Sequence, residues 1–373
     1  MSNTTLILLG AGSSSRFKAN VKKQWIYTQE SPLWLYVAKH FERSAAFKDI
    51  IIVSAFNEMK EMKNFANYTY VEGGNNRQAS LNNALNHVTS NYILVSDIAR
   101  CCVPSEMIQR ILSAQNKASC IVPTLPISDT VYFDGKPIDR EKTRIIQTPQ
   151  LSRTDLLKKA LQTETLFSDD SSAIASLGEK IHFVEGSTKA HKLTTLEDLQ
   201  KVTCLKAPSN RTLTGFGIDT HPFETGKNMF LCGIPIDAPY GFKAHSDGDV
   251  AIHSLIDALL GAAGMGDIGE LYPDTDATYA GVDSKVLLSD TVKRINAFGF
   301  SIGNIDMTIM AETPKLNPYK QKMRESLSSL LGIRGNFINI KASTSERLGF
   351  IGREEGVTVH TIANLTYTNW KKL

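Results

Sequence analysis

Three side chains in the second half of the chain have the types and spacing that could hold a catalytic metal ion. Asp219 and His221 lie two residues apart in a run typical of a strand, so both side chains point to the same side. His253 lies on an apolar helix expected to begin near Asp249. One carboxylate and two imidazoles leave a fourth position open, as in catalytic zinc sites. On spacing alone, packed or exposed histidines would explain the pattern equally well. Asp257, one helical turn after His253, could orient that imidazole.

The first half of the chain begins with a glycine-containing loop and two basic side chains. Gly10 and Gly12 would let backbone N–H groups approach an anion, and Arg16 and Lys23 would add positive charge. The loop lacks the glycine spacing of a dinucleotide fingerprint and the Gly-Lys-Ser/Thr ending of a P-loop. Taken alone, it could equally be a tight turn with surface bases.

Two further segments support a phosphate site in the first half. A second glycine loop at residues 73–76 leads into a helix. Asp97 follows a strand, where a carboxylate can hold Mg²⁺ on phosphates. The alternative for Asp97 is a solvated loop carboxylate beside Arg100.

The elements that must position these residues alternate in type. Strands are expected at 5–9, 49–54, 92–96 and 120–123, and helices at 33–41, 58–66, 79–87, 107–115 and 195–202. Such alternation implies a mostly parallel sheet covered on both faces, with ligands at the carboxyl ends of the strands. The Gly10 loop and Asp97 both follow strands in this way.

A run of turn-forming residues at 207–211 interrupts this pattern. We therefore predict two domains, 1–208 and 209–373. Expected helices of the second domain lie at 250–263, 284–298 and 318–331, and expected strands at 215–218, 302–311, 337–342 and 356–367.

The bulk composition excludes several classes of protein. A net charge of +3 does not suggest binding to nucleic acid or to a membrane surface. No run of about 18 apolar residues is present, and the N-terminus lacks the basic region of a signal peptide. Five cysteines without a C-x-x-C pair fit reduced thiols better than a disulfide framework. We therefore expect a cytoplasmic protein.

In order and spacing, the first-half residues resemble the methylerythritol 4-phosphate cytidylyltransferases, a glycosyltransferase-A-like branch of the nucleotidyltransferases, over about residues 4–206. The resemblance implies a Rossmann-like α/β domain that transfers CMP from CTP, with Mg²⁺ or Mn²⁺ on the nucleotide phosphates. The residues to which it assigns catalysis are Arg16, Lys23, Asp97, Arg140 and Lys192. Those to which it assigns binding of nucleotide or substrate are Gly10, Gly12, Gly74, Asn75, Ser80, Arg100 and Thr130.

The first half departs from that family's pattern at three places. A glycine is usual where Ser14 or Ser15 stands, and a proline where Lys22 stands. Cys101 replaces the proline that usually follows the arginine at position 100. These departures bear on individual contacts more than on the type of reaction.

Residues 245–253, 266–269, 273–276 and 341–353 resemble the 2-C-methyl-D-erythritol 2,4-cyclodiphosphate synthases, and the likeness extends over about residues 212–368. It implies an α+β domain, Zn²⁺ or a similar ion on Asp219, His221 and His253, and a second ion, Mg²⁺ or Mn²⁺, on Glu346. It assigns catalysis to His245 and Thr344. The residues assigned to substrate binding are Ser246, Asp267, Ile268, Gly269, Asp274, Ala311, Lys315, Leu316, Ser343, Glu346, Phe350 and Arg353.

Two other interpretations stay open at this point. One is a zinc hydrolase behind a sugar-nucleotide synthase, which would need a general base beside a zinc-bound water. The other is a scaffold in which one half has lost catalysis. The two implied reactions are separated by an ATP-dependent kinase step. No kinase glycine loop with its partner lysine is recognisable in the sequence, so the kinase would be a separate protein that could associate with this one.

The resemblance also implies a homo-oligomer acting on small molecules, without nucleic-acid or membrane partners. The second domain would form trimers with active sites between subunits, and the first would form dimers. Both symmetries together would close an assembly of six chains.

Overall fold

The computed structural model describes residues 3–244, 246–273, 275–279 and 281–373. The chain divides into two compact units, Met1–Pro208 with Asn369–Leu373, and Ser209–Thr368. The last five residues thus group with the first unit, whereas the predicted second domain included them. Among the described helices, none has both the length and the apolar character needed to cross a membrane.

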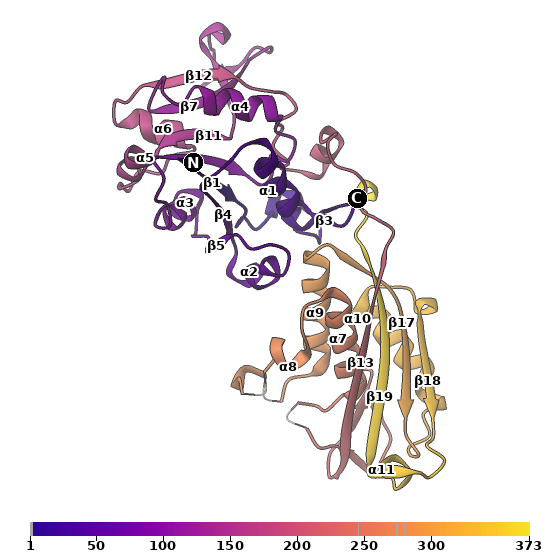
Figure 1. The fold of residues 1–373 in the computed structure, drawn as a ribbon. Helices are drawn as coiled ribbons and strands as arrows, with labels where there is room; N and C mark the ends of the chain where they lie inside the picture. The colour runs from indigo at the N-terminus through magenta and orange to yellow at the C-terminus, as the bar shows by residue number, and fades with distance from the viewer. Residues whose placement is uncertain (1–2, 245, 274, 280) are drawn as a thin grey trace. The chain divides into compact units, whose positions relative to one another are not determined.

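The first unit is built on a mostly parallel sheet (Figure 1). Its strands are β1 (Thr4–Leu9), β4 (Asp49–Ser54), β5 (Thr69–Glu72), β6 (Tyr92–Asp97), β7 (Cys120–Pro126), β10 (Arg144–Ile146), β11 (Gln150–Arg153) and β12 (Ile181–Glu185). Their order is β10-β7-β11-β6-β1-β4-β5, with β12 paired to β7. The predicted α/β class is confirmed, although β10 and β11 run antiparallel to their neighbours.

Helices cover this sheet because its central strands are apolar on both faces. Leu6, Ile7 and Leu8 of β1 are all fully buried, which is typical of a parallel strand between two helical layers. The helices are α1 (Leu33–Ser44), α2 (Phe56–Lys63), α3 (Arg77–Leu85), α4 (Ser105–Ser113), α5 (Thr154–Ala160) and α6 (Asp170–Ser176). The expected helix at 195–202 is instead a 3-10 helix, η4 (Leu196–Lys201).

The register of the sheet brings three strand ends together. Leu9 at the end of β1 pairs with Val53 of β4 on one side and with Asp97 of β6 on the other. Parallel strands end at a common edge, so the loop that follows Leu9 lies beside Asp97.

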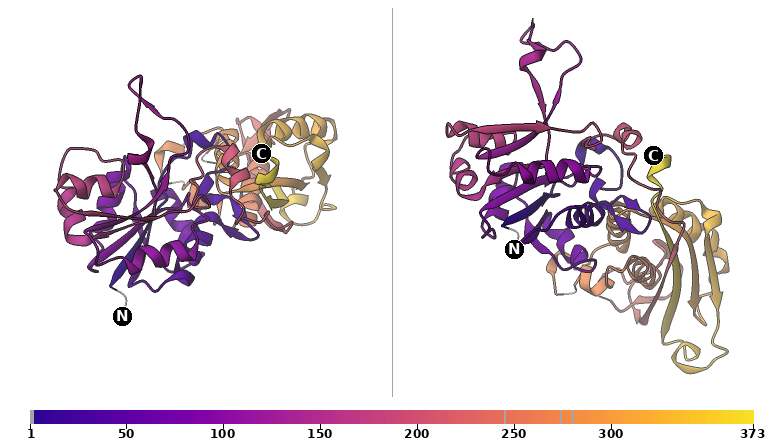
Figure 2. Two further views of the ribbon diagram at one scale, coloured as in Figure 1. Left: turned by 90° about the horizontal axis from the view of Figure 1, so that it is seen from above. Right: turned by 45° about the horizontal axis from the view of Figure 1, so that its top comes forward.

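An arm formed by residues 127–143 projects from the first unit (Figure 2). It carries the short strands β8 (Tyr132–Phe133) and β9 (Lys136–Pro137) and the 3-10 helix η3 (Arg140–Lys142). Tyr132 and Phe133 are 66% and 75% exposed, so the arm leaves two aromatic rings in solvent.

A disulfide joins Cys102 to Cys204, with 5.6 Å between their Cα atoms. The expectation of reduced thiols is therefore wrong for these two residues. They lie 102 positions apart in sequence, so only the fold brings them together. Cys101, Cys120 and Cys232 are free and buried.

The main sheet of the second unit has the order β16-β13-β19-β17-β18, and β14 (Met229–Leu231) pairs with β15 (Ile234–Ile236) in a separate two-stranded sheet. Its strands are β13 (Thr212–Thr225), β16 (Tyr240–Phe242), β17 (Phe300–Met310), β18 (Ile338–Ser343) and β19 (Gly356–Tyr367). The helices α7 (Val250–Ala263), α9 (Ser284–Ala297) and α10 (Lys320–Leu331) pack beside it (Figure 1). The predicted α+β class of this unit is confirmed.

Two glycines of β13 let α7 lie directly against the strand. A Cβ atom at Gly215 would stand 2.0 Å from the carbonyl oxygen of Ala258, and one at Gly217 would stand 2.0 Å from that of Ser254. No side chain larger than hydrogen fits such an approach. This close packing brings the N-terminal half of α7 to the strand that carries Asp219 and His221.

Two candidate active sites

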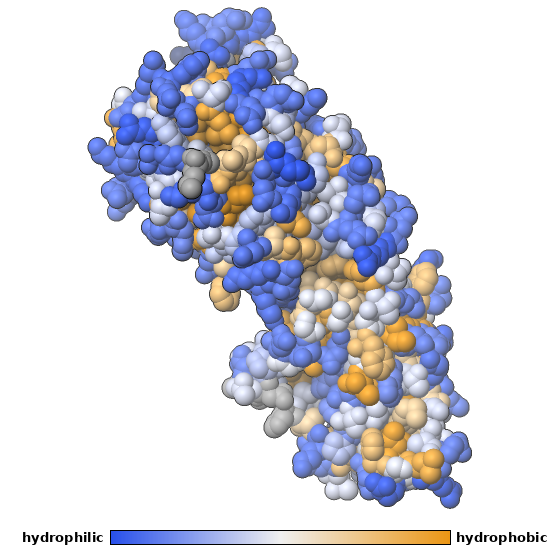
Figure 3. Space-filling view, in the orientation of Figure 1, coloured by the Kyte–Doolittle hydropathy of each residue, from blue (hydrophilic) through white to orange (hydrophobic). Residues whose placement is uncertain are grey.

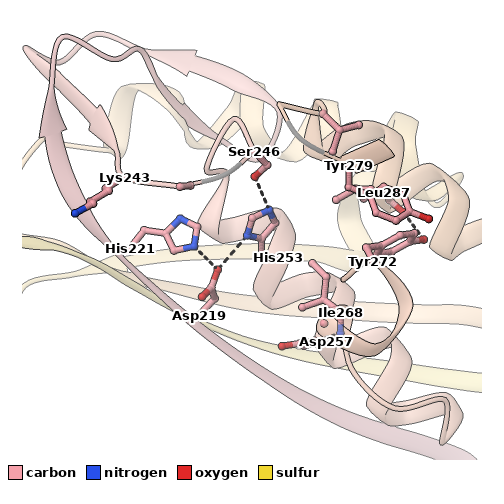
Figure 4. Close-up of a pocket in the computed structure, with 13 residues that line it drawn as sticks. Asp219, His221, Lys243, Ser246, His253, Asp257, Ile268, Tyr272, Tyr279 and Leu287 are labelled. Carbon is pink, nitrogen blue, oxygen red and sulfur yellow. Dashed lines mark hydrogen bonds and ion pairs between the residues drawn. The ribbon is translucent and has the colours of Figure 1, made fainter. Parts of the chain in front are cut away.

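A pocket of about 360 Å³ in the second unit gathers the predicted metal ligands (Figure 4). Its lining comes from β13, α7 and α9 and from the segments that follow β16 and α7. The residues that line it are Asp219, His221, Lys243, Ala244, Ser246, His253, Asp257, Ile268, Gly269, Tyr272, Tyr279, Val282 and Leu287.

Three donor atoms converge in this pocket. Asp219 Oδ2 lies 3.1 Å from His221 Nε2 and 3.2 Å from His253 Nδ1. Within the described part of the chain, Asp219 Oδ2 receives no well-formed hydrogen bond, although it is buried. Three donor atoms that converge on one point at such distances suit a shared cation. The donor set therefore fits the predicted divalent ion.

The second nitrogen of each imidazole is held by another group. His221 Nδ1 donates to the carbonyl of Gly248 at 3.1 Å, which leaves Nε2 with a free lone pair. Ser284 donates its hydroxyl to Asp247, so its oxygen accepts from His253 Nε2 at 2.9 Å. His253 Nδ1 is thereby left free to face Asp219.

The charges of the cluster support one another. Burial opposes ionisation of Asp219, but the facing imidazoles hold its pKa below its usual value. Burial likewise opposes protonation of His221, yet the Asp219 carboxylate raises its pKa. A carboxylate that stays charged in a half-buried site is a good ligand for a cation.

Asp257 and Asp267 do not have the contacts that the sequence predicted for them. Asp257 lines the pocket, but its carboxylate accepts from the backbone N–H of Ile268 at 2.8 Å. The group that orients His253 is Ser284, which sequence reasoning missed. A serine opening a helix gives no sign of contact with a residue 31 positions away. Asp267 lies outside the lining and caps α8 (Ile268–Leu271) by accepting from Glu270 N.

Other predicted residues of this half lie at a different edge of the unit. Met310 and Ser343 pair where the parallel strands β17 and β18 end, and Ala311 donates its N–H to Ser343. Thr344 donates to Glu346 at 3.0 Å in the turn that follows. Eight of the predicted residues are described by the structure but are not among those that line the pocket around Asp219: Ala311, Lys315, Leu316, Ser343, Thr344, Glu346, Phe350 and Arg353. His245 and Asp274 fall outside the described residues.

A pocket of about 500 Å³ in the first unit collects the predicted nucleotide residues. It lies at the carboxyl ends of β1 and β6, between the first glycine loop and the start of α3. The residues that line it are Leu9, Gly10, Ala11, Gly12, Ser13, Arg16, Lys23, Gln24, Gly74, Asn75, Asn76, Arg77, Ser80, Asp97, Ile98, Ala99 and Lys192.

The electrostatics of this pocket favour an anionic ligand. Burial lowers the pKa of Lys23, and the nearby charge of Lys192 lowers it further. Burial opposes ionisation of Asp97, but Lys192, 3.1 Å away, and Arg77 hold its pKa below the usual value. Several cations thus share one carboxylate, and an added polyphosphate would relieve their repulsion.

Arg77 also lines this pocket and was not among the predicted contacts. Its Nη1 donates to the buried Asp170 at 2.7 Å, while its Nη2 has no hydrogen-bond partner among the described residues. An arginine that opens a helix after a glycine loop, where phosphate sites often lie, could have been singled out from sequence.

Three of the residues predicted for the first unit are not among those that line this pocket. Thr130 and Arg140 are exposed in the arm, where Arg140 donates to the carbonyl of Ser128. Arg100 lies next to the pocket, and its Nη1 donates to the carbonyl of Ala190 at 2.6 Å. Their roles stay predictions.

Comparison with known proteins agrees with this division of the chain. Residues 4–205 match the family model described as 2-C-methyl-D-erythritol 4-phosphate cytidylyltransferase, and residues 212–366 match the YgbB family. A bifunctional enzyme IspD/IspF of Sulfurovum sp. (strain NBC37-1) is 66% identical over 100% of both chains. Its counterpart in Sulfurimonas denitrificans is 53% identical over 99% of this chain and 96% of that protein.

The solved structure of the bifunctional IspDF from Campylobacter jejuni is also similar. It superposes with a TM-score of 0.93 at 46% identity, covering 99% of this chain and 100% of that one. The similarity therefore extends through both units and both pockets. This chain belongs to the family of bifunctional IspD/IspF enzymes.

Proposed function

We propose that each unit carries one of the family's two activities at the pocket described above. The first unit transfers CMP from CTP to 2-C-methyl-D-erythritol 4-phosphate and releases diphosphate. The second cyclises 4-diphosphocytidyl-2-C-methyl-D-erythritol 2-phosphate to the 2,4-cyclodiphosphate and releases CMP. The observation that carries this assignment is the separation of two chemistries, with a three-donor metal cluster in one unit and a cationic anion pocket in the other.

In the first unit, the reaction needs positioning and charge neutralisation rather than a covalent intermediate. The phosphate oxygen of the substrate attacks the α-phosphorus of CTP, and diphosphate leaves in line. Arg16 and Lys23 provide the positive charge that the leaving diphosphate requires. Asp97 offers a carboxylate that would hold Mg²⁺ or Mn²⁺, and the ion would help to neutralise the charge of the phosphates.

In the second unit, both the nucleophile and the leaving group belong to the substrate. The families are metal-dependent in general, and we propose that Asp219, His221 and His253 hold Zn²⁺ or a similar ion. Such an ion, when bound, makes the phosphorus more electrophilic. Ser246 lies beside His253, where its hydroxyl can contact a phosphate. Glu346, exposed at the other edge, is the proposed ligand of a second divalent ion, Mg²⁺ or Mn²⁺.

The spread of the predicted residues over two edges supports a site completed by another copy of the chain. Residues proposed for the cytidine phosphate lie at the ends of β17 and β18, outside the metal pocket. The face of the sheet away from the helices exposes Phe216, Ile218 and Ile362 at 59%, 50% and 40%. Apolar side chains gather over β13 and β19 in the space-filling view (Figure 3). Such a patch is typical of an interface.

We propose that second units form trimers through this face and that first units form dimers, giving a closed assembly of six chains. Light scattering of the full chain is expected to give a mass of six subunits. A stable monomer would contradict this arrangement. We also propose that the intervening kinase is a separate protein that associates with this chain, and repeating the light scattering with the kinase added tests this association.

Two single substitutions in the full chain test the division of activities. Lys23→Ala is expected to abolish most diphosphate release from CTP and to leave cyclisation unchanged. His253→Ala is expected to abolish cyclisation and to leave cytidylyl transfer unchanged. Equal loss of both activities in either variant, with both units folded, would show that the two-site assignment is wrong. Metal analysis of the same preparations identifies the ion and its loss from His253→Ala.

A further inference from the structure

Glu58 is a buried carboxylate that lies outside both pockets. It stands in the first turn of α2 and is fully buried. Three side chains donate to it: Lys22 Nζ, Gln24 Nε2 at 3.0 Å and Trp25 Nε1 at 2.9 Å. Lys22 and Gln24 immediately flank Lys23 in sequence, and Trp25 follows Gln24. We propose that Glu58 is a positioning residue that fixes Lys23 for cytidylyl transfer.

The link from Glu58 continues to the glycine-containing loop. Gln24 Oε1 accepts from the Ser14 hydroxyl at 3.2 Å, and Ser14 Oγ accepts from the backbone N–H of Lys23 at 3.3 Å. Ser14 has a φ of 58°, a left-handed conformation that glycine adopts more readily. Its hydroxyl contacts offset part of that strain. One carboxylate therefore connects both segments that line the cationic side of the pocket.

Lys23 needs such an anchor because its surroundings repel it. Burial and the charges of Lys192 and Arg16 lower its pKa and outweigh the opposing effect of Asp97 and Asp198, so the ammonium is destabilised where it stands. A flexible segment would relieve this repulsion by moving outward. A buried carboxylate satisfied by one cation and two N–H donors holds the backbone on both sides of Lys23 in place.

The same contacts predict the effect of replacing Glu58. Glu58→Gln keeps the side chain's shape but presents an NH₂ group to three donors, so part of the cluster loses its acceptor. Lys23 would remain in the pocket and still attract CTP, but its placement at the transition state would suffer. A misplacement of about 1 Å can cost about a hundredfold in rate. Turnover should therefore fall more than affinity.

The test uses the full chain and rests on the proposed activity of the first unit. For Glu58→Gln, kcat for diphosphate release is expected to fall at least about tenfold, with the KM for CTP changed less than about threefold. Cyclisation by the same molecules should be unchanged, which controls for concentration and for folding of the second unit. Lys22→Met removes one donor and is expected to lower kcat by about threefold.

Lys63→Met provides the matched control, because it makes the same change at an exposed position in the last turn of α2. It should leave kcat unchanged. A Glu58→Gln variant with normal kcat and a lower melting temperature would show a purely structural role and overturn the proposal. An inactive unsubstituted chain would instead refute the proposed function of the first unit.

A second variant covers the case in which Glu58→Gln fails to fold. Loss of the first unit's unfolding transition identifies that case. Trp25→Phe then removes the indole N–H that donates to Glu58 and keeps an aromatic ring in the core. A reduced kcat with an unchanged KM for CTP supports the proposal, and an unchanged kcat overturns it.

Discussion

Hydroxyl and carbonyl groups decide which nitrogen of each site histidine can bind a metal ion. His253 Nε2 lies 2.9 Å from Ser284 Oγ, and His221 Nδ1 lies 3.1 Å from the carbonyl of Gly248. Because the Ser284 proton goes to Asp247, the serine oxygen can only accept from His253. The tautomer of each proposed ligand thus depends on residues outside the proposed ligand set.

Replacing Ser284 should therefore weaken metal binding without removing a ligand. Ser284→Ala is expected to lower metal affinity about 10- to 100-fold, because His253 loses the acceptor that fixes its tautomer. Metal titration and cyclisation at limiting metal would measure this, with excess metal restoring activity. Ser289→Ala on the same helix is the control, since its hydroxyl donates to the backbone of Lys285. Equal affinities in the two variants would contradict the role of Ser284.

The lowered pKa of Lys23 predicts that the pH–rate profile of cytidylyl transfer has a limb on the basic side, where activity falls as pH rises. As pH rises through this pKa, Lys23 loses its charge earlier than an ordinary lysine, and cytidylyl transfer falls. Bound CTP favours the charged form and raises the pKa again. The limb in kcat/KM should thus lie at lower pH than the limb in kcat. Lys23→Arg should move both limbs upward, because a guanidinium stays protonated. If the basic limbs of Lys23→Arg lie at the same pH as those of the unsubstituted chain, the titrating group is not Lys23.

At the scale of elements, the proposed metal site depends on how closely α7 approaches β13. The strand positions Asp219 and His221 by its two-residue period, and the helix supplies His253. Their meeting requires glycine at 215 and 217, where a Cβ atom would overlap the backbone of α7.

Gly217→Ala should accordingly displace α7 and separate the ligands. The added Cβ would stand 2.0 Å from the carbonyl oxygen of Ser254, next to His253. Overpacking of this kind costs about 1–3 kcal/mol. Metal content is expected to fall while cytidylyl transfer persists. Gly261→Ala on α7 is the control, because its nearest atom lies at 4.0 Å and the helix should gain about 0.5–1 kcal/mol. Normal metal content in Gly217→Ala would contradict this account.

The disulfide ties two elements of the first unit across 102 residues. In the loop-entropy model such a crosslink contributes about 4–5 kcal/mol. A reducing agent should therefore lower the melting temperature of the first unit and leave that of the second unchanged. Calorimetry with and without dithiothreitol measures this, and Cys204→Ser should remove the effect of the reductant. A reductant effect that persists in Cys204→Ser would assign it to another thiol.

At the scale of the whole molecule, the chain returns to its first unit after completing the second. Trp370 is 4% exposed, and its indole N–H donates to the carbonyl of Tyr27 at 2.7 Å. The last residues thus stabilise the unit formed by the first residues of the chain. This arrangement makes the second unit an insertion between Pro208 and Asn369.

Trp370→Ala should destabilise the first unit, although the residue follows the second in sequence. Removing a buried tryptophan costs about 3–5 kcal/mol. The unfolding transition of the first unit should shift to lower denaturant, and that of the second should not. Lys372→Ala is the control, since its side chain is exposed. A shift confined to the second transition would contradict the assignment of the tail.

Local patterns in the sequence determined much of the site. The two-residue spacing of Asp219 and His221 sufficed to place them on one face of a strand, and the first glycine loop and Asp97 were predicted at strand ends, where they lie. These inferences succeed because strand and helix periods depend on near neighbours.

Only the tertiary structure decided which distant residues meet. The Cys102–Cys204 bond, the Ser284–His253 contact and the return of Trp370 each join positions far apart in sequence. No local pattern encodes them, because each depends on how complete elements pack. The proposed metal ligands illustrate this difference. The sequence determined their chemistry, and the glycine-mediated packing of α7 on β13 decided that they share one site.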